Sequence, residues 1–241
     1  MNNLTELDIK LLKEKYGNLD SVMDKINSNY PVQYLIGNVD FYGYNINVTE
    51  DTLIPRFETE TLVEKSINLI NKYNLNNKRM LEVGTGTGCI SIVLKDKIRS
   101  LDIDALDISD KALAVAKNNA LNNKVDINFI NEDIFKYKPI NKYDILISNP
   151  PYIAYDEVID PKCDYEPIIA LYADNDGMKY YEYLIDNYNL FMNDKFIMCF
   201  EIGYLQGDKL INYAKDKLPE SLIYVEKDLS DKDRYLFIIN E

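Results

Sequence analysis

The 241-residue sequence contains no histidine and no tryptophan, and it has only three cysteines. Without histidine the chain cannot build a Ser-His-Asp triad, a Cys-His pair, a His-ligated zinc site or a His general base. Cys89, Cys163 and Cys199 are odd in number and widely spaced. This spacing is typical of reduced thiols and fits neither a disulfide framework nor a zinc site, so we expect no metal centre.

Basic residues are scarce as well. There are 27 Lys and Arg against 40 Asp and Glu, which gives a formal net charge of −13. Proteins that hold nucleic acid by its phosphates need a basic face, so no stable nucleic-acid partner is expected. The sequence starts MNNLTELDIK, which is no signal pattern, and no apolar run approaches transmembrane length. We therefore expect a cytoplasmic protein that does not associate with membranes.

The first 73 residues suggest short helices and one hairpin. Apolar residues recur at helical spacing over residues 4–12 and 22–30, and Pro31 is expected to end this helical lobe. Alternating apolar residues between Val39 and Val48 predict a β-hairpin around Gly43. A further helix is expected from Glu58 to about Tyr73.

From residue 79 onward, short apolar segments alternate with helical patterns, which predicts a parallel sheet covered on both faces. The expected strands are residues 80–83, 102–106, 126–130, 143–148, 195–201, 222–226 and 235–239. The expected helices are residues 88–98, 110–121, 177–191 and 205–217.

A glycine-rich turn follows the first of these strands. Glu82 stands two residues before Gly84, and the turn runs Gly84-Thr85-Gly86-Thr87-Gly88. A dinucleotide-binding turn has the spacing G-x-G-x-x-G, whereas this one has G-x-G-x-G. The carboxylate of Glu82 would repel a pyrophosphate but attract a cationic group, such as the ammonium of S-adenosylmethionine. A tight turn that binds no ligand is the simpler alternative.

Two acidic residues follow the next two strands. Asp107 ends its strand where an acid can accept hydrogen bonds from ribose hydroxyls. Asp133 can accept from an adenine amino group, and Ile134 and Phe135 offer apolar surface to the base. Ligands of open α/β sheets bind at this edge, so the three segments together predict a nucleoside site better than any one does.

The segment Asn149-Pro150-Pro151-Tyr152 directly follows an apolar strand. Two prolines stop the strand and hold the backbone extended. The Asn149 side-chain oxygen and the Pro150 carbonyl can then receive both hydrogens of a planar –NH2 group, while Tyr152 covers its flat face. We predict Asn149, Pro150 and Tyr152 as catalytic residues, with Pro151 also in the substrate site. Strand termination alone is the competing interpretation.

These motifs resemble the release factor glutamine methyltransferases of the HemK/PrmC type. Five further segments support the resemblance, which extends from about Pro31 to the C-terminus. They are Pro31–Gly37, Ile54–Glu60 (with Phe57 where the family usually has proline), Tyr165–Gly177, Glu201–Gly207 and Asp228–Arg234. Within the second segment, Arg56 and Phe57 are candidates to close over the cofactor.

The resemblance implies a Rossmann-like, seven-stranded methyltransferase sheet whose last strand is antiparallel. It implies transfer of a methyl group from S-adenosylmethionine to the glutamine of the Gly-Gly-Gln motif in bacterial release factors, with S-adenosylhomocysteine as product. It assigns these residues to the cofactor: Gly84, Thr85, Gly86, Thr87, Gly88, Asp107, Ile134 and Asn149. To these we add Glu82 and Asp133 from the arguments above. The glutamine would be held by Asn149, Pro150, Pro151 and Tyr152.

The expected domains are a short helical lobe at 1–36, a hairpin connector at 37–54 and the methyltransferase domain at 55–241. The lobe is shorter than is usual in the family. Three alternatives remain open: a glutamine methyltransferase of a ribosomal protein, a nucleic-acid amino methyltransferase of the N6-adenine type, and a cofactor-binding module without catalysis. The acidic net charge disfavours the second, and the intact Asn149–Tyr152 segment disfavours the third.

Overall fold

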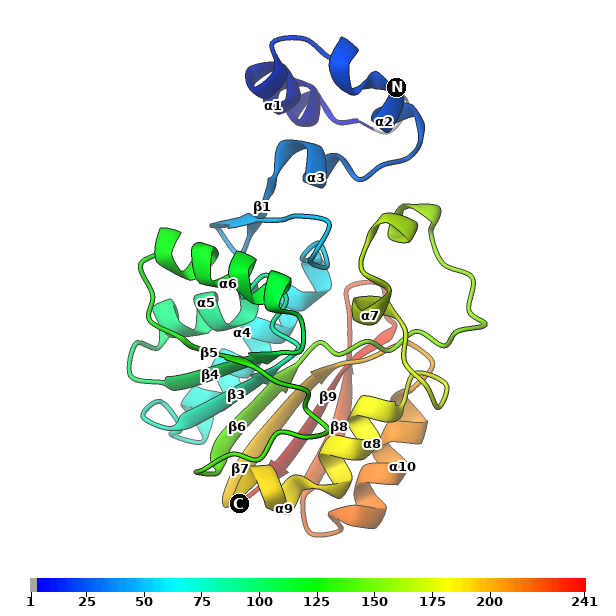
Figure 1. Cartoon of the computed structure of the whole chain (residues 1–241). Helices are drawn as coiled ribbons and strands as arrows, with labels where there is room; N and C mark the ends of the chain where they lie inside the picture. The colour runs from blue at the N-terminus through cyan, green and yellow to red at the C-terminus, as the bar shows by residue number, and fades with distance from the viewer. Residues whose placement is uncertain (1–3) are drawn as a thin grey trace.

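A seven-stranded sheet forms the centre of the computed structural model, which describes residues 4–241 (Figure 1). Its strand order is β5-β4-β3-β6-β7-β9-β8, and β9 runs antiparallel to both of its neighbours. This confirms the fold class expected from the sequence. The strands are β3 (Arg79–Val83), β4 (Asp102–Asp107), β5 (Asn128–Asn131), β6 (Tyr143–Ser148), β7 (Met192–Glu201), β8 (Leu222–Lys227) and β9 (Asp233–Asn240).

Helices cover both faces of the sheet (Figure 1). One face carries α4 (Phe57–Lys72), α5 (Cys89–Lys97) and α6 (Asp110–Asn122), and the other carries α8 (Lys179–Asp186), α9 (Tyr188–Phe191) and α10 (Gly207–Lys217). Successive strand residues alternate between the two cores. Met80 and Ile145 pack toward α4 and α5, whereas Leu81 and Leu146 pack toward α8 and α10. Burial on both faces explains why most residues of the central strands β3 and β6 are apolar.

Most element boundaries differ from the prediction by one to three residues; β7, for example, begins at Met192 and not at residue 195. Hydrogen bonds explain two of the differences. The helix expected over 177–191 is divided at Asn187, whose side-chain amide donates to the carbonyl of Tyr183 and closes the end of α8. The strand expected at 126–130 begins two residues later, because the backbone N–H of Val125 is bonded back to Ala120 of α6.

The N-terminal lobe contains α1 (Glu6–Tyr16), η1 (Asp20–Val22), α2 (Met23–Asn27) and α3 (Val32–Ile36). The interpretation of Pro31 as the end of the lobe is wrong, since α3 follows it directly. Leu12, Val22 and Leu35 form a small core of their own. The lobe lies beyond the hairpin, away from the sheet (Figure 1).

The predicted hairpin consists of β1 (Asn38–Phe41) and β2 (Tyr44–Asn47). Both turn residues, Tyr42 and Gly43, have positive φ, as the two-residue turns of twisted hairpins require. Asn119 of α6 anchors the hairpin, exchanging hydrogen bonds with the backbone of Asn47 at 2.9 and 3.0 Å.

A long connection between β6 and α8 contains two short helices that the sequence did not predict, η2 (Pro161–Tyr165) and α7 (Ile168–Leu171). It extends toward the hairpin and the lobe (Figure 1). Within residues 4–241, no helix combines the length and apolar character needed to cross a bilayer.

Candidate active site

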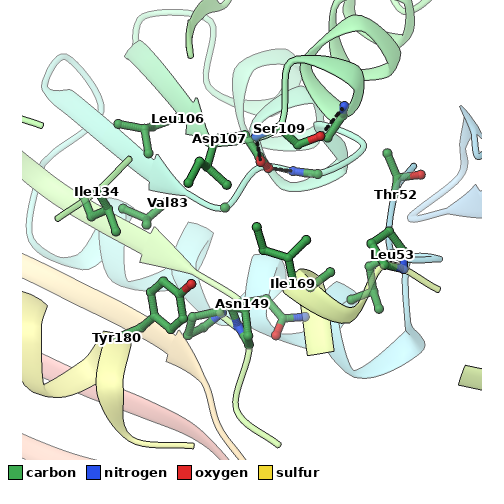
Figure 2. Close-up of a pocket in the computed structure, with 18 of the residues that line it drawn as sticks. Thr52, Leu53, Val83, Leu106, Asp107, Ser109, Ile134, Asn149, Ile169 and Tyr180 are labelled. Atoms are coloured by element: carbon green, nitrogen blue, oxygen red, sulfur yellow. Dashed lines mark hydrogen bonds between the residues drawn. The ribbon is translucent and has the colours of Figure 1, made fainter. Parts of the chain in front are cut away.

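A pocket opens at the carboxyl ends of β3, β4, β5 and β6, beside the point where the strand order reverses (Figure 2). Open α/β sheets bind their ligands at this edge. Eight predicted residues line the pocket: Gly84, Gly86, Asp107, Asp133, Ile134, Asn149, Pro150 and Pro151. Five predicted residues do not: Glu82, Thr85, Thr87, Gly88 and Tyr152.

The glycines of the turn differ in what surrounds them. Gly84 and Gly86 have φ of +72° and +54°, and a Cβ on either would meet no atom within 4 Å. A ligand can therefore approach this backbone closely. Gly88 faces α6 instead, where a Cβ would lie 3.2 Å from the Cβ of Ala116. Gly88 thus permits helix packing and does not face the ligand.

Glu82 is buried behind the turn. Its Oε2 accepts hydrogen bonds from the hydroxyl of Thr85 at 2.8 Å and from the backbone and hydroxyl of Ser91. Burial raises the pKa of Glu82 to about 7, although these hydrogen bonds oppose the shift. In this position Glu82 shapes the turn, and its contact with a cofactor ammonium stays a prediction.

Asp107 reaches the pocket and also holds the turn in place. Its two carboxylate oxygens accept from the backbone N–H of Gly86 at 2.8 Å and of Ser109 at 2.9 Å, as the dashed lines in Figure 2 show. Burial raises the pKa of Asp107, and the two N–H groups counteract it. Each oxygen keeps a further lone pair with which it can accept from a hydroxyl group.

The far end of the pocket is apolar. Ile134, Val83 and Leu106 lie there, and the ring of Tyr180 borders the same space (Figure 2). Phe135 does not line the pocket, contrary to expectation; its ring packs against Tyr180 and Tyr183. Asp133 lines the pocket, but one of its oxygens accepts from the N–H of Phe135 at 3.0 Å. An apolar slot with an acid at its edge suits a purine ring.

Asn149 and Pro150 lie on the opposite side of the pocket, beyond β6. The Nδ2 of Asn149 donates to the hydroxyl of Thr59 at 3.1 Å. Within residues 4–241, no hydrogen bond occupies the Oδ1 of Asn149 or the carbonyl of Pro150. Both predicted acceptors are therefore available to a ligand.

Tyr152 is not among the residues that line this pocket, and its hydroxyl lies 3.4 Å from the Oε1 of Glu201. Burial raises the pKa of Tyr152 far above its ordinary value, so the hydroxyl stays protonated. The backbone carbonyl of Tyr152 accepts from the side-chain amide of Gln206 at 3.1 Å. Gly177 packs on the same carbonyl, which a Cβ at this glycine would meet at 2.0 Å.

Part of the pocket wall was not predicted. Leu53 comes from the segment after the hairpin and Ile169 comes from α7, and the two lie near each other at one end of the pocket (Figure 2). Further unpredicted wall residues are Asp51, Thr52, Ile108, Ser109, Ala112, Glu132, Pro167, Ala170 and Tyr180. The sequence indicated these wall residues only indirectly. Leu53 directly precedes the family-like segment Ile54–Glu60, and Pro167 lies within the family-like segment Tyr165–Gly177.

Arg56 and Glu166 join these two segments. Glu166 is buried, its Oε2 accepts from the guanidinium of Arg56, and its Oε1 accepts from the backbone N–H of Ile54 at 3.2 Å. Arg56 therefore holds the wall of the pocket together. Phe57, the other candidate to close over the cofactor, is 61% exposed and lines none of the pocket.

The pocket thus combines a glycine turn, hydroxyl-accepting carboxylates, an apolar slot and two free carbonyl acceptors. The first three features suit a nucleoside, and the fourth suits a planar –NH2 group beside it.

Several known proteins are similar to this chain in sequence, and others are similar in architecture. The sequence model described as "Methyltransferase small domain" matches residues 59–161. The release factor glutamine methyltransferase of Lactococcus lactis is 34% identical over 98% of this chain and 84% of its own length. The protein of the same name from Enterococcus faecalis is 37% identical, with coverage of 96% and 83%.

Solved structures agree at the level of the fold. A methyltransferase from Pyrococcus furiosus superposes with a TM-score of 0.58 at 16% identity, covering 82% of this chain and 89% of its own. The release factor-specific protein-(glutamine-N5) methyltransferase of Alicyclobacillus acidocaldarius gives a TM-score of 0.50 at 21% identity, with coverage of 78% and 94%.

Proposed function

The chain belongs to the release factor glutamine methyltransferases, and from this premise we propose that it methylates the N5 amide nitrogen of the Gly-Gly-Gln glutamine in release factors. The proposed methyl donor is S-adenosylmethionine. One observation carries the proposal: within residues 4–241 nothing hydrogen-bonds to the Oδ1 of Asn149 or to the carbonyl of Pro150, and both residues line the pocket that holds the apolar slot.

The pocket residues fit S-adenosylmethionine. Gly84 and Gly86 leave open backbone, Asp107 can accept from ribose hydroxyls, and Ile134 borders the apolar slot for adenine. When bound there, S-adenosylmethionine supplies an electrophilic methyl group on sulfur and leaves as S-adenosylhomocysteine.

Asn149 and Pro150 would orient the nucleophile. An amide nitrogen attacks poorly because its lone pair is delocalised into the carbonyl. Two acceptors on its hydrogens hold the –NH2 group in one orientation and increase electron density on nitrogen as the new N–C bond forms. One proton passes from the nitrogen to solvent water as the N–C bond completes. Because that proton becomes acidic only then, a chain without histidine can support the reaction.

The test is methyl transfer to a purified, unmodified release factor, with the modified peptide sequenced by mass spectrometry. One added methyl group on the glutamine of Gly-Gly-Gln is expected. A release factor with alanine at that glutamine is the matched substrate control and should receive none.

Transfer to a ribosomal protein or to nucleic acid, with none to the release factor, would overturn the proposed substrate. The variant N149A should bind the cofactor with little change and lose about 10²-fold or more in kcat, since it lacks the acceptor. An unchanged kcat in N149A would remove Asn149 from the mechanism.

A further inference from the structure

The side chain of Asn149 is oriented by a hydrogen bond to Thr59, a residue 90 positions earlier in the chain. Thr59 lies in the first turn of α4 and is buried. An asparagine amide can be turned by 180° to exchange its oxygen and nitrogen, and the hydrogen-bond partners decide which orientation holds. With Nδ2 bonded to the Thr59 hydroxyl at 3.1 Å, Oδ1 is left as the group that meets the substrate.

Thr59 is in turn directed by Glu201, the last residue of β7. The Thr59 hydroxyl donates to the Oε2 of Glu201 at 2.7 Å, and both side chains are buried. An ionised carboxylate only accepts hydrogen bonds, so the single hydroxyl hydrogen of Thr59 must point to Glu201. The Thr59 oxygen can then only accept from Asn149. The direction of each hydrogen along the chain Asn149 → Thr59 → Glu201 follows from the charge at its end.

The sheet fixes this arrangement. Ser148 of β6 pairs with Phe200 of β7, so Asn149, the first residue after β6, lies beside Glu201, the last residue of β7. The other oxygen of Glu201 faces the hydroxyl of Tyr152 at 3.4 Å. One carboxylate thus contacts Tyr152 directly and Asn149 through Thr59.

We propose that Thr59 and Glu201 are positioning residues for methyl transfer, which together hold Asn149 with its oxygen toward the substrate amide. This inference rests on the proposed function for its kinetic consequence. The orientation of the amide itself does not depend on which substrate is methylated.

Protonation of Glu201 would weaken the arrangement. A neutral carboxyl can donate to Thr59, whose hydrogen is then free to point to Asn149 and favour the turned amide. Burial raises the pKa of Glu201 to about 7, and Arg234 opposes the shift. Charged or titratable groups face Glu201 from each element around it: Glu58 from α4, Tyr152 from the segment after β6, Tyr181 from α8, and Arg234 and Tyr235 from β9. The pKa values of the three tyrosines are raised well above neutrality, so they do not titrate near pH 7.

The experiment compares the full-length wild type with T59V, T59S, E201Q and the control S66A. Valine copies the shape of threonine without its hydroxyl, and serine restores the hydroxyl. Ser66 is a buried hydroxyl on the same helix that takes no part in this chain of hydrogen bonds. With the release factor as substrate, T59V should lose about 10²-fold in kcat, while the Kd for S-adenosylmethionine changes by less than about threefold. T59S should recover most of the rate, and S66A should match the wild type.

The dependence of kcat on pH is a second readout, and it would not change if Thr59 and Glu201 only stabilised the fold. The wild-type kcat should rise with an apparent pKa near 7, and E201Q should be slower and lack this step. A substrate-independent readout is the NMR signal of the Asn149 side-chain amide, identified by its absence in N149A. It should titrate near pH 7 in the wild type and in S66A, but not in E201Q or T59V.

The two readouts separate failure of this inference from failure of the proposed function. A wild type that binds cofactor but does not methylate the release factor overturns the function, and the amide signal still decides the inference. An amide signal that does not titrate, or that titrates equally in T59V and E201Q, overturns the inference. So does a T59V enzyme with wild-type kcat.

Discussion

Arg56 and Glu166 lie 110 residues apart in the chain and form an ion pair beside the pocket. The Glu166 side chain is 1% exposed, whereas that of Arg56 is 37% exposed. Removing the arginine would leave a buried carboxylate that still accepts from the backbone N–H of Ile54 but has lost its counter-charge. The pair therefore joins the segment after the hairpin to the connection that carries α7.

R56A should lower the free energy of unfolding by about 1–3 kcal/mol, below the usual cost of breaking a fully buried pair because Arg56 is partly solvated. Urea denaturation measures this. Leu53 and Ile169 line the pocket and belong to the two segments that the pair joins, so the Kd for S-adenosylmethionine should also rise several-fold in calorimetry. In R56A/E166Q much of the lost stability should return, because no buried charge is left unpaired. A double variant less stable than R56A would argue against this account.

Gly177 should be needed for the position of Tyr152. In G177A the new Cβ would lie 2.0 Å from the Tyr152 carbonyl, so one of the two segments must move. We expect kcat to fall about tenfold or more and the protein to lose stability, as measured by methyl transfer and by thermal unfolding. G43A is the matched control, because Gly43 also has positive φ but a Cβ added there would meet no atom within 4 Å. G43A should lose only about 1–2 kcal/mol of unfolding free energy, because alanine is strained at positive φ, and it should keep its kcat.

Asp107 should govern cofactor affinity. D107N replaces an acceptor of two backbone N–H groups by an amide that can accept with only one of its ends. The Kd for S-adenosylmethionine should rise about 10-fold to 100-fold, because both the turn and the proposed contact to the ribose are weakened. Calorimetry measures the change. D110N alters an exposed acid at the start of α6, the helix that follows β4, and should leave the Kd unchanged; equal losses in the two variants would indicate a general charge effect.

Glu82 should make stability depend on pH. Its pKa is raised from 4.5 to about 7 in the folded protein, so the folded state holds the proton more tightly than the unfolded state. Its contribution to stability is present below about pH 4.5 and is lost as the pH rises to about 7. The loss is of the order of 3 kcal/mol.

E82Q cannot titrate, so its free energy of unfolding should fall less than that of the wild type between about pH 5 and pH 8. Denaturant titrations at a series of pH values give, for each protein, the slope of the free energy of unfolding against pH. Glu201 contributes equally to both proteins, so the difference between the slopes reports on Glu82. Parallel profiles would contradict the raised pKa.

The sequence predicted the parts of the molecule that depend on local patterns. Largely apolar segments such as Tyr143–Ser148 must be buried on both faces, and that requirement leads to a parallel sheet between helices. Glycine spacing and the Asn149–Tyr152 segment lie directly after strands, so their place at one sheet edge follows from the topology. Short elements such as α3 and α7 escaped prediction because four or five residues carry too little periodicity.

The sequence by itself determined the fold class, the family, and the edge of the sheet at which Gly84, Asp107 and Asn149 meet, because each depends on residues close in the chain. Only the tertiary structure decided what stands behind those residues. In the folded protein Glu82 is buried behind the glycine turn, and Leu53 and Ile169 line the pocket. Asn149, Thr59 and Glu201 form one chain of hydrogen bonds. Thr59 and Glu201 are 142 residues apart, and contacts at such separations arise from strand register and helix packing, which no local pattern encodes.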